Sequence, residues 1–229
     1  MTASASNGRD LPVFGPGGDY HPAIESADFG PNVDNPWFPL TPGTTLVYAG
    51  ERDGARAREL VTPLPRTTVI DGVRTRVVFD RLFLDGTLAE RTYDYYAQDD
   101  DGNVWYFGED TVARDDSGNL TDTEGSFRAG VDGAQPGVFM QAHPVIGRRF
   151  RQEWYAGHAE DQFRVVERHA KVTVPYGAFH QALRTEETTD LEPGVIDNKF
   201  YVRNVGEVSE LAVQGGTEHL DLVRIEPAH

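Results

Sequence analysis

The chain has 229 residues, of which 37 are acidic and 21 are lysine or arginine, so its net charge is −16 when histidine is neutral. A protein with this charge repels phosphate groups, so we expect neither nucleic acid nor an anionic membrane surface as a partner. Cysteine is missing from the sequence, which excludes disulfides, thiolate metal sites and cysteine nucleophiles. No run approaches the roughly 18 apolar residues of a membrane span, and the first residues lack the apolar segment of a signal peptide. We therefore expect a soluble protein without membrane insertion, cytoplasmic as the sequence stands and exported if a leader has been removed.

Residues 1–34 are rich in Gly, Pro, Ser, Asp and Asn and show little periodicity. This composition predicts an irregular N-terminal arm. The stretch NPWFPLTPGT then begins a more regular sequence. Because all-β chains of this length commonly form one unit, residues 35–229 are predicted to form a single β-barrel-like domain.

Turn signals follow one another at an even spacing of about 14 to 18 residues. Gly, Asn and Asp tolerate the positive φ angles that tight hairpins need. The dipeptides with this character are Asp53-Gly54, Asp71-Gly72, Asp85-Gly86, Asp101-Gly102, Ser117-Gly118 and Asp132-Gly133. Each interval between them can hold one long strand or two short ones.

The segments between the turns are rich in Val, Thr, Phe and Tyr, which favour strands, and none has a convincing helical periodicity. Ten or more antiparallel strands are too many for a flat sheet. The sequence therefore predicts an all-β fold, a curled antiparallel meander forming a barrel or half-barrel of the calycin-like or lipoprotein-carrier-like kind. A β-sandwich is the second choice.

Several segments resemble a group of uncharacterised bacterial and archaeal β-rich proteins. They are NPWFPLTPGT, YDYYAQDDDGNVWYFGE, RQEWYAGHAED and VTVPYGAF followed by KFYVRNVGEVSEL. The resemblance implies a single all-β domain and brings no activity. More weakly, VPYGAF and YVRNVGEV look like the late strands of lipoprotein-carrier-like half-barrels, an analogy at the level of the fold.

Residues alternate between the two faces of a strand, and three strands pair an apolar or aromatic face with a face of charges and tyrosines. The charged faces point either to solvent or into a barrel lumen, and the sequence leaves both alternatives open. Tyrosines beside carboxylates suit an amphipathic ligand, because they combine contact area with orienting hydrogen bonds. The predicted ligand-binding residues are Tyr93, Tyr95, Trp105, Tyr201 and Glu187.

Lys199 lies in the middle of the strand 196–203, between Asp197 and Tyr201 on one face. A buried lysine needs a carboxylate partner such as Glu153 or Glu187; without one its pKa falls and it can act as a base or nucleophile. A surface ion pair is the simpler interpretation.

The segment His158-Ala-Glu160-Asp161 places a histidine and two carboxylates between predicted strands. Two ligands do not make a metal site, and the sequence has no established metal-binding, hydrolase or nucleotide-binding motif. We interpret this segment as a corner after Gly157 and predict neither a metal site nor a cofactor.

The first functional hypothesis is a β-barrel that binds a small amphipathic ligand. The alternative is a cofactor-independent lyase, isomerase or cyclase. In that enzyme Glu153 or Glu160 would be the general base, and Lys199 or Tyr155 the acid or oxyanion donor. A structural or protein-interaction domain is a third possibility. The sequence does not indicate an oligomeric state.

Overall fold

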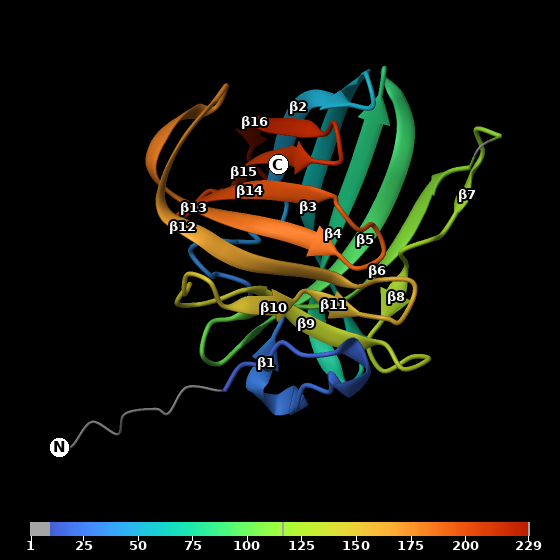
Figure 1. Ribbon diagram of the computed structural model, residues 1–229, viewed down its shortest axis with the longest axis vertical. Helices are drawn as coiled ribbons and strands as arrows, with labels where there is room; N and C mark the ends of the chain where they lie inside the picture. Colours follow the sequence, from blue (N-terminus) through green and yellow to red (C-terminus); the bar gives the residue numbers. More distant parts are fainter. Residues whose placement is uncertain (1–9, 116, 229) are drawn as a thin grey trace.

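All the predicted turn dipeptides but Asp132-Gly133 form the corners of hairpins in the computed structural model, which describes residues 10–115 and 117–228; Asp132-Gly133 lies in a turn between two strands that both pair with a third. Both residues have positive φ angles at Asp53-Gly54, Asp71-Gly72, Asp85-Gly86 and Asp132-Gly133. Paired positive φ angles give the turn a twist that matches that of the flanking strands. The hairpins join into one antiparallel sheet that curls into a nearly closed barrel, so the predicted all-β barrel is confirmed and a sandwich is not formed (Figure 1).

The described residues form two short 3-10 helices and sixteen strands. The helices are η1 (Gly17–Asp19) and η2 (Ser26–Asp28). The strands are β1 (Phe29–Gly30), β2 (Thr45–Arg52), β3 (Ala55–Ile70), β4 (Val73–Leu84), β5 (Thr87–Asp99), β6 (Val104–Arg114), β7 (Leu120–Asp122), β8 (Phe127–Arg128), β9 (Gln135–Met140), β10 (Arg149–Arg151), β11 (Glu153–Trp154), β12 (Asp161–Val174), β13 (Gly177–Thr189), β14 (Ile196–Val202), β15 (Gly206–Gln214) and β16 (His219–Glu226).

Two meanders make up the wall of the barrel. Strands β2 to β6 pair in sequence order, and so do β12 to β16. The last strand pairs with β2, with Glu226 opposite Thr45 and His219 opposite Glu51. This pairing joins the two meanders along one seam.

The segment from Arg149 to Trp154 closes the opposite side of the barrel. Its first half, β10, pairs with β12, and its second half, β11, pairs with β9. Gln152 lies between the two pairings, and its backbone N–H donates to the Asp161 carbonyl at 2.8 Å. The sequence predicted one strand here, but the structure divides it because each half pairs with a different edge.

The described part of the N-terminal arm lies along the base of the barrel (blue in Figure 1) and is tied to it at several points. The Tyr20 hydroxyl donates to the Pro136 carbonyl at 3.2 Å, and β1 pairs with the end of β5. Residues 1–9 of the predicted arm lie outside the described residues.

Two apolar clusters stabilise the molecule. The larger one fills the base, where Trp105, Phe107 and Phe150 are almost fully buried. The smaller one lies around β2, β15 and β16 and contains Val208, Leu220 and Leu222. Within the described residues, no helix is long and apolar enough to cross a membrane.

Candidate functional site

A cavity of about 360 Å³ occupies the lumen of the barrel. Its volume falls in the range of small-molecule sites. The polar side chains that line it come from strands on both sides of the barrel, and apolar side chains line it near β2, β3 and β9. We describe it as three surfaces, the lysine wall, the acidic wall and the apolar wall.

The alternation of β5 explains why the lumen is polar. Asp94 and Tyr96 line the cavity, so Tyr93 and Tyr95 point to the other side of the sheet. Of the two alternatives left open by the sequence, this strand turns its carboxylate face inward. Tyr93 and Tyr95 are on the outside, whereas Tyr96 shares the inner face with Asp94.

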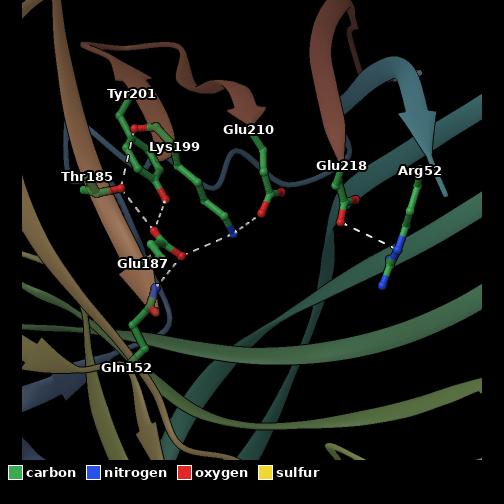
Figure 2. A network of polar contacts seen from close by, with 8 residues as sticks. All are labelled: Arg52, Gln152, Thr185, Glu187, Lys199, Tyr201, Glu210 and Glu218. Carbon is green, nitrogen blue, oxygen red and sulfur yellow. Dashed lines mark hydrogen bonds and ion pairs between the residues drawn. The ribbon is translucent and has the colours of Figure 1, made fainter. Parts of the chain in front are cut away.

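The lysine wall is built by β13, β14 and β15 (Figure 2). The Lys199 Nζ lies 3.4 Å from Glu187 Oε2 and 3.3 Å from Glu210 Oε1. These contacts arise because Thr185 pairs with Lys199 in one neighbouring strand and Glu210 pairs with it in the other. Lys199 is therefore held between a carboxylate on each side.

Glu187 also accepts hydrogen bonds from neutral donors. The Thr185 hydroxyl donates to its Oε1 at 3.1 Å, and the Gln152 amide donates to its Oε2 at 3.4 Å. The Tyr201 hydroxyl lies 3.5 Å from Oε1. These donors fix the carboxylate in the position from which it meets Lys199 (Figure 2).

The carboxylates keep Lys199 protonated. Burial by itself would lower the pKa of Lys199, but the negative charges of Glu187, Glu210 and Glu207 outweigh it and raise that pKa well above its ordinary value. A lysine in this state is an ammonium ion and not an amine nucleophile.

The acidic wall is built by β3 to β6 and contains two pairs of carboxyl groups. In the first pair, the Tyr106 hydroxyl lies 2.7 Å from Asp94 Oδ1 and 2.8 Å from Glu109 Oε2. A hydroxyl has one proton to donate. If both contacts are hydrogen bonds, one of the two carboxyl groups is protonated and donates to the Tyr106 oxygen.

The second pair is Glu59 and Asp80, which are diagonal neighbours on β3 and β4 because Val61 pairs with Asp80. Two ionised carboxylates at neighbouring positions repel each other, which favours a proton on one of them. Burial raises the pKa of both groups, and the neighbouring carboxylates raise them further. The Glu59 and Asp80 carboxyl groups both lie inside the barrel. Each side chain keeps some accessible surface because it faces the open lumen.

The apolar wall consists of aliphatic and aromatic side chains, which include Phe38, Leu46, Val61, Val78 and Phe139. The ring of Phe139 lies 5.0 Å from that of Tyr96, which in turn stacks on Tyr106 at 4.8 Å. The apolar wall therefore meets the acidic wall at an aromatic cluster.

An ion pair outside these walls extends the charged array toward β2 and β16. The Arg52 guanidinium lies 3.6 Å from Glu218 (Figure 2). Burial raises the pKa of Glu218 to about 7, and Glu210 adds to this effect.

Three of the residues predicted from the sequence line the cavity, namely Glu153, Glu187 and Lys199. Tyr201 is only 1 % exposed and lies behind Glu187, to which it donates. Burial raises the pKa of Glu153 well above its ordinary value, and Asp161 adds to it. Whether these residues bind a ligand stays a prediction.

The predicted aromatic residues Tyr93, Tyr95 and Trp105 do not line this cavity. Tyr93 stacks on Phe79, and the Tyr95 hydroxyl donates to Asp110 at 2.6 Å on the outer face of the barrel. Trp105 donates to Asp99 at 2.9 Å in the base. Tyr93 and Tyr95 lie outside the cavity because they alternate with Asp94 along β5. Trp105 lies outside it because it packs in the base against the N-terminal arm.

The predicted residues Tyr155 and Glu160 belong to the corner that follows β11. The Glu160 carboxylate accepts a hydrogen bond from the Gly157 N–H at 2.7 Å, and the Tyr155 ring stacks on His158. Neither lines the cavity, whereas His158 and Asp161 do. The interpretation of residues 158–161 as a corner agrees with this geometry.

The acidic wall was not predicted from the sequence. Its signal was the repeated carboxylate or hydroxyl at alternate positions of β5, Glu90, Thr92 and Asp94. Among the described residues, no group of three or more His, Asp or Glu side chains is arranged to hold a metal ion.

No family model and no curated protein matches this chain. Two solved structures are similar to it. One is described as an exported protein of Bacteroides fragilis with a YmcC-like fold, at 15 % identity, a TM-score of 0.48 and coverage of 83 % of this chain and 99 % of that one. The other is described as a lipoprotein of Parabacteroides distasonis, at 10 % identity, a TM-score of 0.44 and coverage of 83 % and 98 %.

Proposed function

We propose that this protein binds a small amphipathic molecule in the lumen of its barrel. The observation that carries the proposal is the cavity itself. It has a volume of about 360 Å³ and is lined by both an apolar wall and polar walls. Burial of apolar area supplies affinity in such sites, and a few placed polar groups orient the ligand.

The alternative, a cofactor-independent lyase, isomerase or cyclase, has less support. Its four predicted residues are separated, with Glu153 and Lys199 at the cavity and Tyr155 and Glu160 in the corner. The raised pKa of Lys199 also makes it a poor base and a poor proton donor at neutral pH. Binding is therefore the function that we propose.

Native mass spectrometry of the protein purified from its own host tests this proposal. We expect a retained small molecule that is lost in the variant Val61→Phe, because the larger side chain fills part of the cavity from β3. The matched control is Val69→Phe in the same strand, where the valine is 58 % exposed, and it should retain the molecule. Equal occupancy in the two variants, or no retained molecule and no hit in a small-molecule thermal-shift screen, contradicts the proposal.

A further inference from the structure

The lumen contains far more acid than base. Nine carboxyl side chains and one lysine are among the described residues that line the cavity. Lys199 is already engaged by Glu187 and Glu210. The acidic wall thus receives no cation from the described residues around the lumen.

The lack of a cation is clearest at one oxygen atom of Asp80. Its Oδ1 is buried and receives no hydrogen bond from an amide, hydroxyl or cationic group of the described chain. The nearby Glu59 carboxyl raises the pKa of Asp80 by its negative charge, in addition to the effect of burial. A buried carboxylate is normally paired with a cation or fully hydrogen-bonded, so this atom marks a place where a donor from outside the chain fits.

Each carboxyl pair of the acidic wall can exchange its proton for an ammonium group. An ammonium ion presents three donors and satisfies two carboxylates at once, as Lys199 does on the lysine wall. The Tyr106 hydroxyl would then donate to one of Asp94 and Glu109 while both are ionised.

The two pairs are separated across the sheet. One lies on β3 and β4 and the other on β5 and β6, so their centres are two strand spacings apart, about 10 Å. A single metal ion cannot reach both pairs, and no metal-binding cluster is found in the described chain. Beside the pair on β5 and β6, the aromatic cluster of Tyr96, Tyr106 and Phe139 offers ring faces, which attract ammonium groups and contact methylene chains.

We infer that the lumen binds an organic cation with two or more amino groups joined by an aliphatic chain, a diamine or polyamine. The ammonium groups lie at the two carboxyl pairs, and the chain lies against the aromatic cluster and the apolar wall. This inference rests on the proposed function and names the class of its ligand.

The remaining charged groups around the lumen agree with this assignment. They are Glu153 of β11, Glu187 of β13, Lys199 of β14, Glu207 and Glu210 of β15, and His158 and Asp161 of the corner. Seven carboxyl groups other than the two partners of Lys199 therefore line the lumen together with one histidine. Since burial raises the pKa of Glu59, Asp94 and Glu109, binding of the diamine releases protons to the buffer.

Isothermal titration calorimetry with three six-carbon probes tests the inference. They are 1,6-diaminohexane, the neutral 1,6-hexanediol and the dianion adipate. We expect the diamine to bind at least tenfold more tightly than either of the others at pH 8. Its affinity should fall at least tenfold at pH 6, and titrations in two buffers with different ionisation enthalpies should show proton release.

The variant Asp94→Asn/Glu109→Gln should lower the diamine affinity at least tenfold, and Asp80→Asn alone should lower it as an independent check on the other pair. The matched control is Asp110→Asn. It removes a carboxylate from the outer face of β6, the strand that also carries Glu109, at a position where the carboxylate pairs with Arg128. Unchanged affinity in folded acidic-wall variants overturns the inference.

The outcome also separates this inference from the proposed function. Preference for hexanediol or adipate, with loss of that probe in Val61→Phe, overturns the cationic ligand and leaves a ligand-binding lumen. If none of the probes binds, the cation inference fails, and the retained-molecule experiment decides the proposed function by itself.

Discussion

Lys199 keeps its charge inside the barrel because it has a carboxylate on each side, and its side chain is 20 % exposed. Glu187 does not depend on it alone, since Thr185, Gln152 and Tyr201 also donate to that carboxylate. The lysine and its partners therefore form one network, in which the loss of the cation leaves two carboxylates without their counter-charge (Figure 2).

The variant Lys199→Met tests that network. We expect it to lower the free energy of unfolding at pH 7 by about 3 kcal/mol, because removal of one member of a buried ion pair leaves an uncompensated charge. Urea denaturation measures the change. The matched control is Lys171→Met, which replaces an exposed lysine of β12 and should change stability by less than about 0.5 kcal/mol. An equal effect of the two substitutions would show that the network adds no stability.

At the scale of the elements, the closing segment Arg149–Trp154 depends on one glycine. A Cβ atom at Gly137 in β9 would lie on the carbonyl group of Gln152 and the carbonyl oxygen of Arg151. These are backbone atoms, so a side chain at position 137 forces β10 and β11 away from the edge strand.

We expect Gly137→Ala to destabilise the barrel by at least about 2 kcal/mol, because the added methyl group has no space without a backbone shift. The matched control is Gly30→Ala in β1, where no atom lies within 4 Å of the added carbon. Thermal unfolding followed by circular dichroism measures both variants. A Gly137→Ala protein that unfolds at the temperature of the control would contradict the close approach.

The strands and hairpins were largely predictable because turn dipeptides and alternation are local signals. The pairing of β16 with β2 and the division of the segment 149–154 were not, because they depend on contacts between distant parts of the chain. The site was predictable only in part, since alternation gives two faces of β5 without saying which one is inside. Tyr93 and Tyr95 were chosen for their chemistry, whereas Asp94 occupies the lumen.

At the scale of the whole molecule, the barrel encloses acid groups that the unfolded chain exposes to water. Burial raises the pKa of Glu59 and Glu109 to about 8, and the nearby carboxylates Glu210 and Asp94, respectively, raise them further. The folded chain therefore holds protons that the unfolded chain has already released, with an ordinary carboxyl pKa of about 4.5.

Stability should consequently fall as the pH rises from about 5 to 8. In this range the folded state binds more protons than the unfolded state, and each such proton contributes a slope of about 1.4 kcal/mol per pH unit. The lowered pKa of Asp110 acts in the opposite direction but only at more acidic pH. Urea midpoints at pH 5, 6.5 and 8 measure the trend, and Glu109→Gln should flatten it. A midpoint that rises toward pH 8 would contradict the raised pKa values.

The short segment that covers both β9 and β12 also bears on self-association. An uncovered strand edge presents free backbone N–H and C=O groups that can pair with another molecule. Because one segment protects two edges at once, its detachment exposes both together, and an open sheet with two free edges can extend in both directions. A substitution at Gly137 that detaches this segment would thus free the edge of β9 and the start of β12 for pairing with another chain.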